Sequence, residues 1–321
     1  MAQGMKELRR RIRSVTSIQK ITRAMEMVAT TRLRRMQTRA EGARPYADAI
    51  QGFSALLAGG GTTLSSPLTQ TRDPVKRIAL LVLTSDRGLC GPFNANVFRK
   101  VSAFLGERSK LELVLHVVGR KGRQHYARRL RIAVAHPDEV EKLGHRRARE
   151  IARQLTELFL SGSQTEGGVD EVWVVYTRFV SVGRQVTTVD RLLPITADAG
   201  GTSQGATAKS GAMVAAGGAV KDAAAKTGGA AGAIVGAPIL LEPSPQELFD
   251  VLLPKSLAMR LFAAMLDSMA SEQAARRMAM KAATDAAGEM IQTLTRRYNR
   301  ARQEAITKEL LDIVGGAEAL A

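Results

Sequence analysis

The sequence predicts an α/β protein in which the N- and C-terminal helices form a long antiparallel two-helix coiled coil, joined to a small Rossmann-like α/β domain. The first observation is a stretch of about sixty helix-forming residues, 255–314, with Gly288 as its only breaker. At ~1.5 Å per residue such a helix is about 90 Å long, too long for a compact domain to bury. The second is a helical apolar pattern near the N-terminus. The third is an alternation of strands and helices between the two.

Residues 1–58 are expected to form the N-terminal helix of the coiled coil. Apolar side chains recur there mostly at three- and four-residue steps, the spacing of one apolar stripe on a helix. The stripe consists of Leu8, Ile12, Val15, Ile18, Ile21, Met25, Val28, Leu33 and Met36. Arginine and lysine fill the other faces, and Gly42 with Pro45 predicts a bend or weak point near the end.

Residues 59–74, rich in Gly, Thr, Ser and Pro, are expected to link this helix to an α/β domain at residues 75–196. Short apolar runs alternate there with helical patterns, at spacings typical of a largely parallel sheet. The expected strands are 77–85, 111–118 and 171–176, with 185–193 as a candidate edge strand, and the expected helices are 95–105, 124–130 and 142–160.

Residues 197–237 are an insert of mainly Ala, Gly, Ser, Thr and Lys without an aromatic side chain. So few large apolar residues cannot offset the entropy of ordering, and we expect a mobile, largely dispensable segment. A marginal Ala-rich helix at 219–226 is the alternative. Residues 238–321 form the last unit, in which several prolines and a short element at 246–252 precede the long helix.

The two terminal helices are expected to pack on one another, because the alanines of the C-terminal stripe allow a second helix to approach closely. That stripe consists of Leu257, Leu261, Ala264, Ala275, Met278, Ala282, Ile291, Leu294, Tyr298, Ala301 and Ala305. The alternative, separate packing of each helix on the α/β domain, fits poorly with so small a sheet. Since the C-terminal helix is longer, it outruns its partner and leaves an apolar tip that predicts enclosure by another protein. The tip contains Leu310, Leu311, Ile313, Val314 and Leu320.

Charge and rare residue types narrow the possible functions. A formal net charge of +17 indicates an anionic partner, which could be nucleic acid, a membrane surface or an acidic protein face. The single Cys90 excludes an internal disulfide, and the four histidines lack metal-ligand spacing, so no metal site is expected. No apolar run reaches the ~20 residues of a membrane span. The Arg-rich N-terminus is similar to a mitochondrial transit peptide, but Glu7, Glu26 and the length of the helical pattern argue against one.

Two loops are weighed as phosphate sites because each follows a predicted strand. Neither SDRGLCGPFN, residues 85–94, nor GRKG, residues 119–122, has P-loop or dinucleotide-motif spacing, so no nucleotide or other cofactor is expected. Cys90 is interpreted as a packed turn thiol. No Ser/His/Asp set or pair of carboxylates stands out, so no catalytic residue is expected.

Three parts of the chain resemble the gamma subunit of F-type ATP synthases. They are KELRRRIRSVTSIQKITRAMEMVATTRLRRMQ near the N-terminus, SDRGLCGPFNANV after the first strand, and SEQAARRMAMKAATDAAGEM with YNRARQEAITKELLDIVGGAEAL at the C-terminus. The resemblance implies a non-catalytic central-stalk rotor that couples ion-driven rotation of a c-ring to ATP synthesis in an alpha/beta catalytic hexamer. Chloroplast members carry a redox-active cysteine pair in an insert near this position. The insert at 197–237 has no cysteine, which excludes that regulation.

The resemblance also implies partner-contact residues. For the acidic loop of the beta subunit they are Met25 on the N-terminal helix and, at the matching level of the C-terminal helix, Arg302, Gln303, Thr307 and Glu309. Glu242 would meet the c-ring. The residues alone favour simpler interpretations, in which Met25 is stripe core and the others are solvated or local helix neighbours.

The implied partners are the alpha, beta, epsilon and, in the assembled complex, delta subunits, together with the c-ring. The implied location is the cytoplasmic side of the cell (plasma or inner) membrane, peripheral, with membrane contact only through the complex and no nucleic-acid partner. A nucleic-acid-binding protein that uses the basic N-terminal helix is the runner-up, although few aromatic residues and no recognised module support it. A nucleotide-dependent α/β enzyme is the third interpretation, with the weakest motifs.

Overall fold

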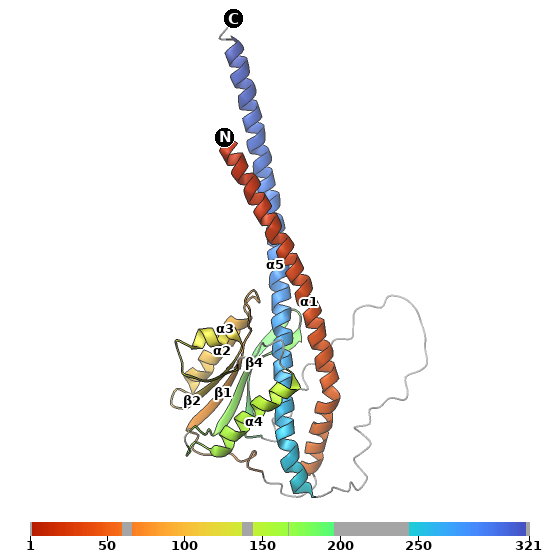
Figure 1. Ribbon diagram of the computed structural model, residues 1–321, viewed down its shortest axis with the longest axis vertical. Coiled ribbons are helices and arrows are strands. Elements are labelled where there is room, and N and C mark those ends of the chain that lie inside the picture. The colour runs from red at the N-terminus through yellow and green to blue at the C-terminus, as the bar shows by residue number, and fades with distance from the viewer. Residues whose placement is uncertain (1, 60–65, 137–143, 166, 196–243, 319–321) are drawn as a thin grey trace, which may run out of the picture.

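The computed structural model describes residues 2–59, 66–136, 144–165, 167–195 and 244–318. Two long helices run side by side over most of its length, and an α/β domain packs against their lower part (Figure 1). Helix α1 (Ala2–Gly59) runs down from the N-terminus and helix α5 (Pro245–Glu318) runs back up to the C-terminus. The predicted fold class, an antiparallel helix pair with a small α/β domain, is therefore confirmed. The insert at 197–237 lies outside the described residues.

The α/β domain is built on a five-stranded sheet in the order β3-β2-β1-β4-β5. Strands β1 (Arg77–Leu83), β2 (Glu112–Val118), β3 (Ile132–His136) and β4 (Glu171–Ser181) are parallel, and β5 (Arg184–Leu193) pairs antiparallel with β4. The predicted edge strand is thus present as β5. The sequence analysis did not predict β3, which lies at the other edge.

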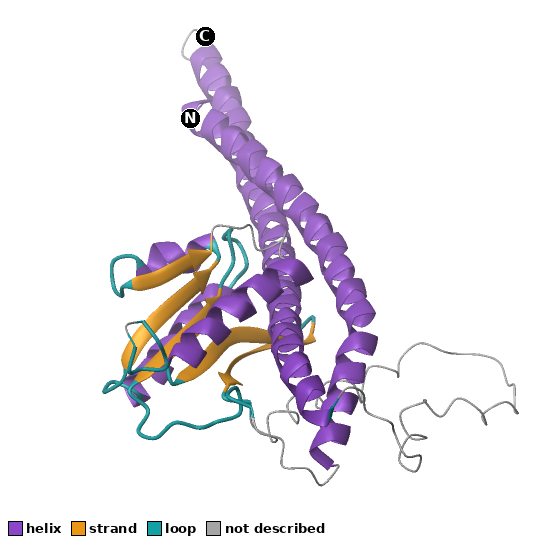
Figure 2. Cartoon of the chain, turned by 60° about the horizontal axis from the view of Figure 1, so that its bottom comes forward, coloured by secondary structure: helices purple, strands orange, loops and turns teal. Residues whose placement is uncertain are grey.

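Helices cover both faces of the sheet (Figure 2). On one face, helix α2 (Phe93–Glu107) and helix α3 (Arg120–Tyr126) pack against the alternate β1 side chains Ile78, Leu80 and Val82. On the other face lie helix α4 (His145–Ser161) and the lower part of α5. The continuous apolar run of β1 follows from this double coverage, because a strand buried on both faces has no solvent side. Helix α3 begins and ends earlier than the predicted 124–130.

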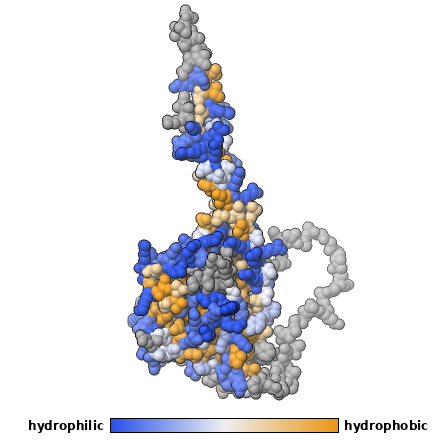
Figure 3. All heavy atoms as spheres, in the orientation of Figure 1, coloured by the Kyte–Doolittle hydropathy of each residue, from blue (hydrophilic) through white to orange (hydrophobic). Residues whose placement is uncertain are grey.

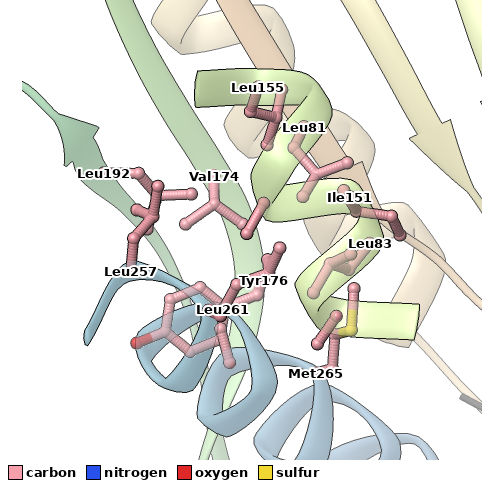
Figure 4. Packing of buried hydrophobic residues seen from close by; sticks show 14 of the residues in the cluster. Leu81, Leu83, Ile151, Leu155, Val174, Tyr176, Leu192, Leu257, Leu261 and Met265 are labelled. Atoms are coloured by element: carbon pink, nitrogen blue, oxygen red, sulfur yellow. The ribbon is translucent and has the colours of Figure 1, made fainter. Parts of the chain in front are cut away.

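The second face holds the larger core (Figure 4). Leu81 and Leu83 from β1 meet Ile151 and Leu155 from α4, and α5 closes the cluster. The labelled contacts from α5 are Leu257, Leu261 and Met265. All three α5 side chains are at most 1% exposed, so α5 is part of the domain core as well as of the helix pair.

Helix α5 is longer than predicted at its start. Ser244 caps it, with its Oγ accepting a hydrogen bond from the N–H of Glu247 at 3.2 Å, and Pro245 occupies the first turn, where its missing N–H costs nothing. The helix then continues through Pro254 without the predicted separation of a short element from the long helix. Helix α1 is likewise continuous through Gly42 and Pro45.

The predicted α1 stripe is wrong at three positions. Ile18, Ile21 and Val28 are 50% to 59% exposed, whereas Thr22 and Ala29 are buried. Thr22 and Ala29 lie seven residues apart and continue the buried line through Leu33 and Met36, so the helix turns its small and polar side chains inward here. On α5 the predicted Met278 and Ala282 are exposed, and Met280 and Ala287 are buried instead.

Candidate functional site

The candidate site is the helix pair itself, which we call the shaft, defined as α1 together with residues 257–318 of α5. Its two helices touch through small and polar groups. Thr22 Oγ1 and Thr284 Oγ1 are 2.7 Å apart, and a side chain added at Gly288 would lie 3.1 Å from Nε2 of Gln19. Sequence reasoning missed Gln19, Thr22 and Thr284. The signal that could have identified Gln19 and Thr22 is their three- and four-residue spacing from one another and from the buried residues further along α1.

The shaft ends in a single helix. Because the helices are antiparallel and Thr22 lies beside Thr284, the register places the start of α1 near position 304 of α5. Beyond that point α5 has no partner helix among the described residues, and Figure 1 shows it passing the N-terminus. Ile306, Leu310 and Leu311 on this overhang are exposed by half or more. The predicted unequal length is confirmed, whereas the side chains of Ile313, Val314 and Leu320 are outside the description.

Exposed apolar side chains also lie along the paired part of the shaft. On α1 these are Ile18, Ile21, Met27 and Val28, and on α5 they are Met278 and Met290. In Figure 3 orange surface interrupts the blue of the shaft above the α/β domain. No described part of the chain covers these apolar groups, and such a gathering is typical of a contact surface for another protein.

The structure separates the residues predicted to meet one partner loop. Met25 is half-buried on α1 and lies near position 281 of α5, whereas Arg302 is about 20 residues, or about 30 Å, further along the helix. The prediction that they share one level of the shaft is therefore wrong, because the antiparallel register brings Met25 to a different part of α5. Glu242 lies outside the described residues.

The four predicted contact residues on α5 do lie close together. Arg302, Gln303, Thr307 and Glu309 are all exposed. Gln303 and Thr307 share a shallow groove with charged neighbours and one leucine. Its lining is Arg300, Gln303, Glu304, Thr307, Lys308 and Leu311. These residues recur at three- and four-residue steps and so form one face of α5 where the helix passes the start of α1, mixed in charge and open to solvent.

The α/β domain holds the lower shaft by polar bonds as well as by its core. Ser271 Oγ donates to the carbonyl of Thr177 at 3.0 Å, and Arg260 Nη2 donates to the carbonyl of Arg191 at 3.1 Å. Nearby, the hydroxyl of Tyr176 donates to Asp190 at 2.9 Å. Burial, and then the Asp190 charge, raise the pKa of Tyr176 to about 12, so it remains a donor at neutral pH. Several directional bonds thus fix the angle between sheet and shaft.

The glycine-containing loop after β2, residues 119–122, is filled by the protein's own contacts. The N–H groups that open α3 donate to the chain itself: Arg120 to Asp86, Lys121 to the Ser85 carbonyl and Gly122 to Thr84 Oγ1, at 2.9–3.0 Å. An added Cβ would lie 2.3 Å from the Thr84 carbonyl oxygen at Gly119 and 2.6 Å from Thr84 Oγ1 at Gly122. The glycines therefore permit close packing, and these amide groups are already engaged rather than directed at a phosphate.

Cys90 in the other loop is buried, and its thiol lies 3.3 Å from Asn94 Nδ2. Burial raises the pKa of this thiol, which favours the unreactive protonated form. Among the described residues no group of three His, Cys, Asp or Glu side chains could hold a metal ion. No described helix combines the length and hydrophobicity needed to cross a membrane.

Comparisons with known proteins agree on one family. The family model described as ATP synthase matches residues 4–320. The ATP synthase gamma chain of Heliobacterium modesticaldum is 41% identical over 319 residues, covering 99% of each chain, and that of Saccharopolyspora erythraea is 41% identical over 333 residues, covering 100% of this chain and 98% of the relative.

Solved structures share the fold at lower identity. A chain of the Euglena gracilis mitochondrial ATP synthase, from an OSCP/F1/c-ring structure, gives a TM-score of 0.60 at 18% identity, covering 100% of this chain and 95% of that chain. A chain of the Tetrahymena thermophila enzyme, from a central stalk and c-ring structure, gives 0.52 at 22% identity, covering 82% and 99%.

Proposed function

The chain belongs to the gamma-chain family of ATP synthases, and from this premise we propose that its shaft is the rotor that couples ion-driven turning of a c-ring to ATP synthesis in an alpha/beta hexamer. One observation carries the proposal: α5 extends beyond α1 as a single helix whose exposed side chains include Ile306, Leu310 and Leu311. A stiff but asymmetric projection is what a turning element needs in order to act on several surrounding sites in succession.

The rotor is proposed to be non-catalytic within an enzyme complex. Support comes from the loop that follows β2, where protein acceptors occupy the N–H groups that could otherwise hold a phosphate. In this proposal the partner subunits carry out the chemistry. The contribution of this chain is mechanical, because the lower part of α5 is held by the core around Leu261 and Met265, while the overhang has no partner helix among the described residues.

The proposed partners differ between the upper and lower parts of the shaft. We assign Arg302, Gln303, Thr307 and Glu309 to the acidic loop of a beta subunit, because all four are exposed among charged neighbours where α5 passes the start of α1. Met25 contacts the hexamer at a separate, lower level. Exposed ion pairs are each worth only ~0–1 kcal/mol, so such contacts attract without locking one angle. Glu242 is assigned to the c-ring, and the alpha, epsilon and delta subunits complete the partners. In this proposal the chain lies peripherally on the cytoplasmic side of the cell membrane, with membrane contact only through the complex.

Reconstitution tests this function. The full chain is mixed with purified alpha and beta subunits, and the products are separated by size-exclusion chromatography and assayed for ATP hydrolysis. We expect the chain to co-elute with the hexamer and hydrolysis to depend on its presence. A chain that remains monomeric, with no affinity for the hexamer, contradicts the proposal. Binding to double-stranded DNA that weakens steeply with salt would support the nucleic-acid alternative instead.

A further inference from the structure

A buried ion pair joins the lower shaft to the loop between β1 and α2, residues 84–92. Arg276 Nη2 lies 2.7 Å from Glu272 Oε1, and the two side chains are only 9% and 5% exposed. The same nitrogen of Arg276 lies 3.4 Å from the carbonyl oxygen of Gly88, near the tip of the loop. One guanidinium nitrogen therefore faces both a carboxylate on its own helix and the backbone of a segment 188 residues away in the chain.

This pair differs from the other pairs on α5 with the same spacing. Arg300 and Glu304 form an i, i+4 pair at 3.1 Å with side chains 84% and 60% exposed, where solvent reduces the interaction and little desolvation is required. Burying two charges is costly unless further hydrogen bonds compensate them. At Arg276 the Gly88 carbonyl contributes such a bond, so the position of the loop and the burial of the pair depend on one another.

The loop itself is shaped to sit on the helix. Cys90 and Phe93 form a buried cluster with Ala275, and at Gly91, where φ is +55°, an added Cβ would lie 3.7 Å from the Ala279 side chain. The Asn94 side chain accepts from the N–H of Ser85 and donates to its Oγ at 2.7 Å, which ties the two ends of the loop together. The loop is thus preorganised before it reaches α5.

Its tip is strained and exposed. Leu89 has a φ of +62°, a left-handed conformation that is unfavourable for a non-glycine residue, and its side chain is 61% exposed. Such a conformation persists only where neighbouring contacts impose it. The neighbours on either side are Gly88, which accepts from Arg276, and Cys90, which packs on Ala275.

We propose that Arg276 is a positioning residue: held by Glu272, it fixes the tip of the β1–α2 loop, residues 87–89, to the shaft. The tip then turns together with α5 and forms a second rigid contact point toward the surrounding subunits. The contact with those subunits depends on the proposed rotor function, whereas the lock between loop and shaft does not. The lock transmits force directly between α5 and the carboxyl end of the central strand β1.

Cys90 is a built-in reporter of this lock, because it is the only cysteine of the chain and lies buried within the loop, where it packs against Ala275 on α5. The test measures the rate at which a water-soluble aromatic disulfide reagent modifies Cys90 in the full chain. We compare wild type with Arg276→Gln and with the exchanged pair Glu272→Arg/Arg276→Glu. The exchange retains an ion pair within the helix but removes the donor that faces Gly88. Arg300→Gln is the matched control in an exposed pair.

If the lock exists, both variants at 276 react about tenfold faster than wild type, because losing a buried charged hydrogen bond increases local opening, while Arg300→Gln reacts at the wild-type rate. Circular dichroism and thermal unfolding identify any variant that is globally unfolded. If Arg276→Gln is unfolded, the Cys90 modification rate of the exchanged pair tests the proposal. A wild-type rate in the exchanged pair overturns the proposal, since the ion pair within α5 would then suffice.

The second part of the test uses the assembled enzyme. With the exchanged pair assembled beside alpha and beta subunits in the full membrane enzyme, we expect ATP hydrolysis to remain while coupled ATP synthesis is lost. Unchanged synthesis, together with fast Cys90 modification, overturns the force-transmitting role. Failure of the wild-type chain to assemble would instead contradict the rotor function, and the Cys90 rates of the free chain would still test the lock.

Discussion

The lower and upper halves of helix α5 have the same backbone geometry and opposite surroundings. In the lower half, residues 253–280, all six side chains from Ser271 to Arg276 are buried, because the sheet, α4, α1 and the β1–α2 loop surround the helix. In the upper half, among residues 281–311, only Ala287 is buried. The chain therefore buries the lower half of α5, which we call the foot, with its own residues, and leaves the upper half exposed.

The two halves also differ in the bonds that hold them. The lower half is held by directional bonds, including Ser271 to the Thr177 carbonyl and Arg276 to the Gly88 carbonyl. Within the described residues, the upper half has one hydrogen-bonded link to α1, between Thr22 and Thr284, and exposed pairs such as Arg300 with Glu304. A foot that resists twisting and a tip without strong directional bonds together describe a part that transmits rotation and slides against its surroundings.

The largest expected effect is the difference between equivalent truncations in the two halves. Leu261→Ala removes a side chain that is 0% exposed and should lower the free energy of unfolding by ~2–5 kcal/mol, through lost burial and the cavity left behind. Leu311→Ala, its exposed counterpart, should change it by less than about 0.5 kcal/mol. Urea unfolding of the free chain measures both. Similar losses from the two variants would remove the basis of the comparison.

Lowering the pH should reduce the free energy of unfolding through His116, which is buried on β2. Neither ring nitrogen of His116 has a hydrogen-bond partner among the described residues. Burial, and then the neighbouring His136, lower the pKa of His116 from 6.5 to about 4. Between these values the unfolded chain binds more protons than the folded one. Stability is therefore full above pH 6.5 and falls toward pH 4, by up to roughly 3 kcal/mol.

Urea unfolding between pH 7 and pH 4 measures this loss, and His116→Leu should remove most of the slope. A variant that keeps the wild-type slope would assign the acid sensitivity to another group. The upper half, where the described residues include no histidine, should contribute nothing comparable.

Exposed apolar groups of the overhang should matter only in the complex. The double substitution Ile306→Ser/Leu311→Ser should leave the unfolding of the free chain unchanged, because both side chains are at least half exposed. It should weaken association with the alpha/beta hexamer by about 1–3 kcal/mol, the cost of losing part of the apolar burial in the partner. Titration by surface plasmon resonance measures the change, and an unaltered dissociation constant would argue that the overhang is not enclosed.

The smallest expected effect concerns the one polar link between the helices of the upper shaft. Thr22→Ala, Thr284→Ala and the double variant form a cycle whose coupling energy should be ~0.5–1.5 kcal/mol, the usual net value of a hydrogen bond. Denaturant unfolding measures the three differences. A coupling near zero would mean that the hydroxyl groups are satisfied within their own helices, through the carbonyls of Gln19 and Met280.

Periodicity predicted which segments are helices better than it predicted how they face. The α1 stripe was chosen for its apolar residues, so it included Ile18, Ile21 and Val28, which the structure exposes. The inward positions nearby, Thr22 and Ala29, are small because a second helix passes close to them. A pattern based on hydrophobicity alone cannot distinguish an apolar side chain facing its own partner helix from one facing another protein.

Short elements were also predicted poorly from the sequence. Strand β3 has only five residues, and Ala133, Val134 and Ala135 between its ends are exposed, so it has neither the length nor the buried apolar run by which the other strands were predicted. It is a strand because β2 beside it offers a row of backbone partners from Leu115 to Val118. The predicted break before Pro254 was also wrong, because the helix continues through it. The burial of Leu253 and Leu257 on either side of Pro254 outweighs the backbone hydrogen bond that a proline cannot donate.

The sequence by itself determined the two long terminal helices, the alternating strands of the domain and the unequal length that leaves an overhang, because each depends on local periodicity and composition. Only the tertiary structure decided the register that separates Met25 from Arg302, the inward face of α1 and the lock between Arg276 and Gly88. These features arise from contacts between residues far apart in the chain, and no local pattern specifies which distant groups meet.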